Sequence, residues 1–279
     1  MSELLKRTLT GILIVVFVLG GFWLHPVSFF ITGLVILTGT QYEYYNLIRK
    51  SGINPQMIPG LATGITAYTA STLVAMKFIS INWFCILIPA VPIIMILELY
   101  RKEEMPFNSI AHTLLPFLYI VLPLSLLPFT AFNHSGIKSL LSHEIVFSPG
   151  VIVGFLLLLW TNDTAAYLAG VSFGHHRLFE RISPKKSWEG FISGFVFTVA
   201  VACLLPGWLG VFDRIGWIAT AVIIVAGGTY GDLIESLLKR SMGLKDSGNI
   251  MPGHGGFLDR FDSMMISFPL VYLYFTLFG

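Results

Sequence analysis

The sequence predicts an all-α polytopic membrane protein with about nine transmembrane helices, and three observations support this. Of its 279 residues, 55% are hydrophobic and 11% are charged, and the mean hydropathy is +0.78. A soluble domain is typically about 25% charged, so a soluble protein of this size would lack polar surface. Apolar stretches of about 20 residues, long enough to cross a bilayer, recur along the chain. Lysines and arginines also fall mainly in alternate connections between these stretches.

The apolar stretches follow one another with short connections that leave no room for a soluble domain. The first has a basic start but no convincing small-residue cleavage site, so we expect it to be retained as a helix. The third contains several threonines, and a very short turn separates it from the fourth. The predicted helices cover residues 8–24, 27–47, 57–76, 79–98, 109–131, 146–169, 188–206, 214–234 and 262–278.

The distribution of basic residues predicts the orientation of these helices, because short cytoplasmic loops are rich in lysine and arginine. All but three of the 17 lysines and arginines fall on the side of the N-terminus. The exceptions are Lys77, Lys138 and Arg214. The N-terminus is therefore predicted to be cytoplasmic and the C-terminus outside, as in a multi-pass membrane protein.

Residues that could take part in catalysis or ligand binding are concentrated in the second half of the chain. We expect residues 1–135 to form a scaffold of five helices that offers lipid access, with Glu98 as a solvated charge at a helix end. Residues 136–279 hold four helices and two long cytoplasmic loops, which we expect to be catalytic. The two cysteines lie in apolar runs without metal-ligand spacing, so no thiol site is predicted.

Several carboxylates stand where lipid-facing residues would be expected. Asp163 lies within the sixth predicted helix, where inserting a charged side chain into the bilayer costs at least about 2.5 kcal/mol of free energy. A hydrogen-bonded contact between helices is the structural alternative for Asp163. On the eighth helix, one face carries residues at positions i, i+3, i+4 and i+7. These are Asp232, Glu235, Ser236 and Lys239. The ninth helix begins with Asp259 and Asp262, one turn apart.

The aspartates are predicted to reach a similar depth near the cytoplasmic face. Carboxylates that converge at low dielectric repel one another unless a cation neutralises them. Ligation by oxygen alone suits Mg²⁺ or Ca²⁺ rather than zinc, and Mg²⁺ is typically held by one or two carboxylates plus substrate phosphates. The basic residues nearby then suit a phosphorylated substrate, although positive-inside topology explains many of them equally well. They are Lys185, Lys186, Lys239, Arg240, Lys245 and Arg260.

The glycine-rich turn before the ninth helix, PGHGG, provides backbone N–H groups that can point at an anion near a helix N-terminus. This signal is weak alone, because any tight turn uses glycine and proline.

Two functional classes remain: a Mg²⁺-dependent enzyme acting on a phosphorylated lipid and a nucleotide, and a cation-coupled transporter. The crowding of these groups at one interface favours the enzyme, since transporter sites lie near the midplane.

The segment from Ser236 to Asp262 resembles the signature of the phosphatidate cytidylyltransferases. Its pattern is S-x-x-K-R-x4-K-D-x6-G-H-G-G-x-x-D-R-x-D. Two further segments agree: NDTAAY around Asp163, and SPKKSWEG at 183–190, which is similar to the family's S-P-x-K-T-x-E-G. Ser187 replaces the threonine, and Met251 replaces a usual leucine, isoleucine or phenylalanine. The detailed match covers roughly residues 160–265.

This resemblance implies transfer of CMP from CTP to phosphatidate, giving CDP-diacylglycerol and pyrophosphate in bacterial phospholipid synthesis. It also implies a multi-pass protein of the bacterial cytoplasmic (inner) membrane with its active site facing the cytoplasm. It implies Mg²⁺ held by Asp232, Asp259 and Asp262, and leaves a second cation such as K⁺ open. It implies membrane lipids as partners, no nucleic acid, and a homodimer. A related CTP-dependent transferase acting on an isoprenoid lipid is the alternative. The remaining residues predicted for catalysis or substrate binding are Asp163, Ser183, Lys185, Ser187, Ser236, Lys239, Arg240, Lys245, Asp246, His254, Gly255, Gly256 and Arg260.

Overall fold

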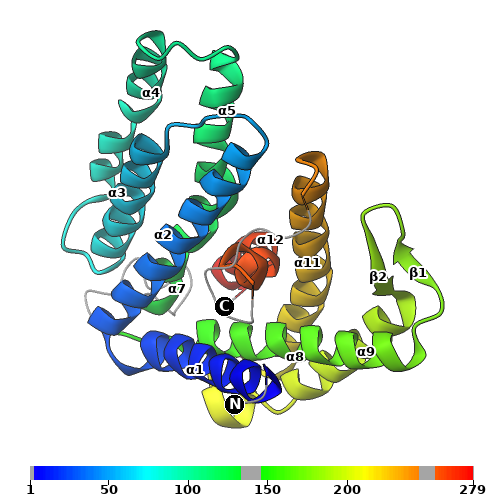
Figure 1. The fold of residues 1–279 in the computed structure, drawn as a ribbon. Helices are drawn as coiled ribbons and strands as arrows, with labels where there is room; N and C mark the ends of the chain where they lie inside the picture. The colour runs from blue at the N-terminus through cyan, green and yellow to red at the C-terminus, as the bar shows by residue number, and fades with distance from the viewer. Residues whose placement is uncertain (1–2, 133–145, 245–254, 279) are drawn as a thin grey trace. The chain divides into compact units, whose positions relative to one another are not determined.

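The computed structural model describes residues 3–132, 146–244 and 255–278, and this part of the chain is almost entirely helical (Figure 1). It forms two compact units. The first contains residues 1–129 and 241–261, and the second contains residues 130–240 and 262–279. The functional division of the chain at residue 135 stays a prediction.

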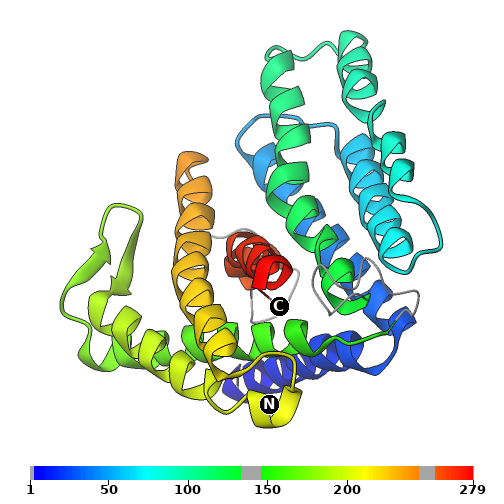
Figure 2. The same ribbon diagram turned by 180° about the vertical axis from the view of Figure 1, so that it is seen from behind.

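The first unit is a helical bundle in which α2, α3, α4 and α5 run side by side (Figures 1 and 2). The Tyr45 hydroxyl of α2 donates to the Thr113 carbonyl of α5 at 2.9 Å. The stretch 106–132 is interrupted because its prolines lack the N–H that a continuous helix needs. The elements are α1 (Glu3–Leu24), α2 (Pro26–Lys50), α3 (Met57–Ala75), the 3₁₀ helix η1 (Ile81–Leu87), α4 (Ala90–Leu99), α5 (Pro106–Pro116), the π-helical turn η2 (Phe117–Val121), α6 (Leu122–Ser125) and α7 (Leu127–Phe132), which ends in the second unit.

The second unit contains α8 packed along α9, and α11 packed against α12. A Cβ on Gly231 of α11 would lie 2.7 Å from the Asp262 carbonyl oxygen of α12, so only glycine permits this close approach. Gly231 thereby brings Asp232 close to Asp262 of α12. The elements are α8 (Gly150–Phe173), β1 (Arg177–Phe179), β2 (Ser183–Ser187), α9 (Trp188–Ala202), α10 (Pro206–Leu209), α11 (Arg214–Ser241) and α12 (Leu258–Phe278), whose first turn belongs to the first unit.

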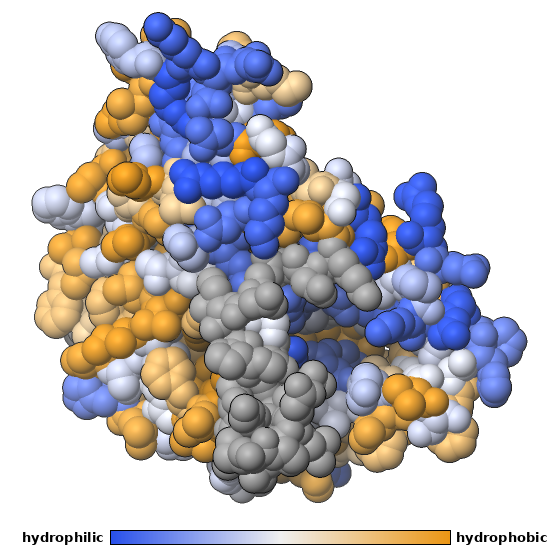
Figure 3. All heavy atoms as spheres, in the orientation of Figure 1, coloured by the Kyte–Doolittle hydropathy of each residue, from blue (hydrophilic) through white to orange (hydrophobic). Residues whose placement is uncertain are grey.

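The all-α membrane class is confirmed, because the described residues include 6 helical segments that are long and apolar enough to cross a bilayer. These are Ile81–Leu99, Pro106–Phe132, Gly150–Phe173, Trp188–Leu209, Arg214–Ser241 and Leu258–Phe278. Figure 3 shows hydrophobic side chains over much of the left of the face drawn, and hydrophilic ones over the β1–β2 hairpin at the right. Helices α1, α2 and α3 are not among the six, so nine spans and their orientation stay predictions.

A short antiparallel hairpin lies within one of the two segments that the sequence predicted as long loops. Strands β1 and β2 pair with Arg177 opposite Ser187 and Phe179 opposite Ser183. The Glu189 carboxylate pins the base of the hairpin by accepting the backbone N–H groups of His175 and His176, at 3.2 Å each. Its Oε1 also lies 2.6 Å from Nδ1 of His176. The hairpin fixes which lysine of SPKKS faces the helices.

Glu98 at the end of α4 is buried, contrary to the expectation that it is solvated; its exposed fraction is 4%. Its Oε2 accepts from Gln56 and lies 2.9 Å from Nη1 of Arg101. The Arg101 guanidinium also donates to the Asn54 carbonyl and to Glu103 Oε1, at 2.7 and 3.0 Å. Arg101 therefore joins two loops and neutralises a buried acid. The distribution of lysines and arginines, which assigned Arg101 only to the cytoplasmic side, does not indicate this role.

Arg101→Ala should destabilise the protein by about 2 kcal/mol. Removing one partner of a fully buried ion pair costs about 3–5 kcal/mol, and we expect less here because the Arg101 side chain is 25% exposed. Arg49→Ala, at an exposed position of the last turn of α2, should change stability by less than about 0.5 kcal/mol. Denaturation in detergent measures both, and equal stability of the two variants would show that the Glu98 pair contributes nothing.

Candidate functional site

Three carboxylates of α11 and α12 converge in the second unit. Asp232, Glu235 and Asp262 can each offer one oxygen, and these oxygens all lie within 4.8 Å of one another. Glu235 and Asp262 are buried, with exposed fractions of 1% and 7%, and Asp232 is partly exposed. Because like charges at this separation repel, the arrangement favours a bound cation, and an oxygen-only donor set fits Mg²⁺.

Two ammonium groups contact these carboxylates. Nζ of Lys186, on β2, lies 2.7 Å from Oδ2 of Asp232 and donates to the Thr229 carbonyl at 3.2 Å. Nζ of Lys239 lies 2.5 Å from Oε2 of Glu235, one turn earlier on α11. The site thus combines acids that suit a cation with bases that suit phosphate oxygens.

Asp163 of α8 belongs to the same neighbourhood. Its charge and that of Asp232 both act on Asp262. The buried Asn162 donates from Nδ2 to Oδ1 of Asp163 at 3.5 Å, while Asp163 itself is exposed. The structure therefore brings together carboxylates from three helices, α8, α11 and α12.

The predicted serines lie on the elements around this cluster. The Ser236 hydroxyl donates to Oδ1 of Asp232 at 3.3 Å. Ser187 is buried and caps α9, its Oγ accepting the Gly190 N–H at 3.2 Å. Ser183 is partly exposed at the start of β2. Ser236 is thus oriented toward a carboxylate of the cluster, whereas the Ser187 hydroxyl is used to cap α9.

Asp259 is engaged at the start of α12 and is not one of the three grouped carboxylates. Its Oδ2 accepts the Gly256 N–H at 3.2 Å, in a turn where Gly255 adopts a φ of +80°. Its role as a metal ligand stays a prediction. Lys185, Arg240 and Arg260 are exposed. The predicted site residues Lys245, Asp246 and His254 lie outside the described residues.

The structure gives Lys186 and Glu235, both noted in the sequence, a contact with the carboxylate cluster that the sequence had not assigned to them. Successive strand residues point to opposite faces, so Lys186 reaches Asp232 while its neighbour Lys185 is exposed. The motif could have singled out Lys186, because the lysine of S-P-x-K-T-x-E-G aligns with Lys186 and not with Lys185. Glu235 was already assigned to the helix face of Asp232 but not to the metal site.

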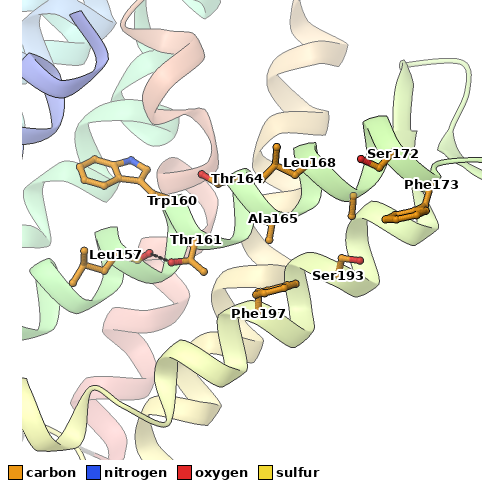
Figure 4. A pocket seen from close by; sticks show the side chains of 11 residues that line it. Leu157, Trp160, Thr161, Thr164, Ala165, Leu168, Ser172, Phe173, Ser193 and Phe197 are labelled. Carbon is orange, nitrogen blue, oxygen red and sulfur yellow. Dashed lines mark hydrogen bonds between the residues drawn. The ribbon is translucent and has the colours of Figure 1, made fainter. Parts of the chain in front are cut away.

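A pocket of about 630 Å³ lies on α8 and α9 (Figure 4). Its lining is mainly apolar, with Trp160 and Phe197 among the larger side chains. Four hydroxyl-bearing residues interrupt this lining, and one of them, Thr161, donates to the Leu157 carbonyl at 2.7 Å. Its volume and apolar lining are typical of a small-molecule site.

Fold and site together define a helical membrane protein with a carboxylate cluster suited to a metal and phosphates. A family model described as "Cytidylyltransferase family" matches residues 5–278, and the chain belongs to this family.

Several relatives with the name phosphatidate cytidylyltransferase are similar to part of this chain. The protein from Staphylococcus aureus (strain COL) is 45% identical over 117 residues, which make up 41% of this chain and 45% of the relative. Those from Staphylococcus epidermidis and Staphylococcus haemolyticus (strain JCSC1435) are each 44% identical over the same length. The match therefore spans less than half the length of these relatives.

Proposed function

We propose that this protein transfers CMP from CTP to phosphatidate, releasing pyrophosphate and forming CDP-diacylglycerol. The observation that carries the proposal is the cluster of Asp232, Glu235 and Asp262, in contact with Lys186 and Lys239 and built into apolar helices. Membership of the cytidylyltransferase family and the names of the partial relatives support it.

In the proposed reaction, a phosphate oxygen of the lipid attacks the α-phosphorus of CTP. The new P–O bond forms as the bond from the α-phosphorus to the bridging oxygen breaks, and pyrophosphate leaves. Such chemistry asks the protein mainly to align two phosphorylated substrates and to stabilise their charge. Lys186 and Lys239 would exchange a carboxylate contact for phosphate oxygens, and the Ser236 hydroxyl would add a hydrogen bond.

We propose Mg²⁺ as the cofactor, held by Asp232, Glu235 and Asp262, with Asp259 as a further candidate. When bound, Mg²⁺ neutralises phosphate oxygens and so lowers the barrier to attack. A second cation such as K⁺ would take the remaining negative charge. The convergence of these three carboxylates within the described residues supports this assignment.

The α8–α9 pocket suits the hydrocarbon part of the lipid, since its lining is mainly apolar. We further propose that the site faces the cytoplasm, where CTP is available, in a bacterial inner membrane, and that the protein acts as a homodimer among membrane lipids without nucleic acid. The fourteen basic residues assigned to the N-terminal side support the orientation.

The test of this function is an assay of purified protein with radiolabelled CTP. We expect label to enter phosphatidate as CDP-diacylglycerol in the presence of Mg²⁺, and not to enter isoprenyl phosphates. Transfer to isoprenyl phosphates alone would favour the isoprenoid alternative. Failure with both lipids, together with cation flux in proteoliposomes, would favour a transporter.

The orientation makes a separate prediction. In a variant with Cys85 and Cys203 replaced by serine, single cysteines at Lys102 and Arg181 should resist an impermeant thiol reagent added to intact cells. Both positions are exposed, so the membrane and not burial would protect them. A cysteine at Lys77, assigned to the opposite side, is the matched positive control. Labelling at Lys102 or Arg181 in intact cells would overturn the orientation.

A further inference from the structure

A buried acid of the first unit contacts the start of α12, far away in the sequence. Glu43 lies in α2 and its exposed fraction is 1%. Its Oε2 accepts the N–H of Leu258, the first residue of α12, at 2.7 Å. Glu43 and Leu258 both belong to the first unit.

This contact has a clear physical basis. The first N–H groups of a helix have no partner within the helix, and its N-terminus carries a partial positive charge. A buried carboxylate is costly unless it is hydrogen-bonded. The hydrogen bond therefore satisfies both groups, and α2 provides a capping side chain for the start of α12.

The surrounding backbone is fitted to this carboxylate. A Cβ on Gly256 would collide with the carboxyl group of Glu43. On α2, one turn before Glu43, a Cβ on Gly39 would lie 3.0 Å from the ring of Phe257. The side chain of Asp259 holds the Gly256 N–H at 3.2 Å. The turn before α12 is thus held by α2 and by its own helix.

We propose that Glu43 is a positioning residue for the cytidylyl transfer, an inference that rests on the proposed function. By holding the Leu258 N–H it fixes where α12 begins, and with it the directions in which Asp259 and Asp262 leave the first turns of that helix. In this role Glu43 itself touches no reacting atom. It acts through the backbone to which the acids are attached.

Glu43→Gln in the full-length protein tests this proposal, because it keeps the volume but removes the charge and so weakens the hydrogen bond to the Leu258 N–H. Misplacement by about 1 Å can cost about 10²-fold in rate, so we expect kcat to fall by about 10- to 10²-fold with the KM for phosphatidate little changed. Half-maximal activity should need more Mg²⁺. Independently of activity, amide hydrogen exchange should rise in a peptide covering 255–262 and stay unchanged in α11.

Two controls separate positioning from general stability. Glu98→Gln alters an acid that is buried to a similar degree but bonded to Gln56 and Arg101, so it should lower the melting temperature and leave the kcat of folded protein near wild type. Gly39→Ala should lower kcat a few-fold by displacing Phe257, although alanine favours the helix. It also covers the case in which Glu43→Gln fails to fold.

The outcomes decide the proposal separately from the function. If wild-type protein transfers CMP and Glu43→Gln does so at the wild-type kcat, the positioning role is wrong and the function stands. Loss of activity only in proportion to unfolded protein, as expected for Glu98→Gln, would also overturn it. If wild type is inactive on every lipid, the proposed function fails. Exchange in 255–262 then still shows whether Glu43 holds the start of α12.

Discussion

Asp262→Asn should lower the rate of CMP transfer by at least about 10²-fold, by analogy with the loss of a key electrostatic stabiliser. The metal-free variant should nevertheless melt no lower than wild type. Asp262 is buried beside the like charges of Asp232 and Asp163, so removing its charge relieves repulsion. The amide carbonyl of the substituted side chain can still accept the Ser263 N–H that Asp262 accepts at 2.6 Å.

Melting temperatures with and without Mg²⁺ check this prediction. Mg²⁺ should stabilise the wild type through binding linkage and should stabilise Asp262→Asn much less. Asp213→Asn is the matched control in the same unit, because the Asp213 carboxylate accepts the Gly216 N–H near the start of α11, at 2.7 Å, and is not one of the three grouped carboxylates. An Asp262 variant that is destabilised without metal but turns over normally would show that the acid is structural.

Lys186→Ala should lower turnover by about 10- to 10²-fold, whereas Lys185→Ala should change it less than about 3-fold. Charge-assisted phosphate contacts are worth about 1.5–3 kcal/mol, and one decade in rate corresponds to about 1.36 kcal/mol. Lys186 reaches Asp232 at 2.7 Å, while its neighbour on the strand is exposed. The two variants remove the same charge from adjacent positions, so net charge and membrane attraction cancel in the comparison.

Steady-state kinetics at several salt concentrations measure both variants. A contact with a phosphate in the site should persist at salt concentrations that screen an exposed lysine. Equal losses from Lys185→Ala and Lys186→Ala would show that the hairpin lysines act only through membrane attraction. A larger loss from Lys185→Ala would restore the residue that the sequence had favoured.

Composition and hydropathy were enough to predict that this is a helical membrane protein. Low charge and apolar stretches of bilayer length left only a helical membrane protein, because hydrocarbon admits few alternatives to intrahelical hydrogen bonds. Helical periodicity alone also placed Asp232, Glu235 and Lys239 on one face of α11. The motif around Asp262 then indicated the family without any tertiary contact.

Packing between helices determines which of these groups meet. Glu235 joins Asp232 and Asp262 because Gly231 lets α11 approach the backbone of α12. Lys186 contacts Asp232 because a hairpin fixes strand alternation in a segment that the sequence predicted as a long loop. Glu43 meets Leu258 across 215 residues of sequence. Such contacts depend on how distant segments pack together. The periodicity of one segment shows which of its faces is polar, but not which other segment that face will contact.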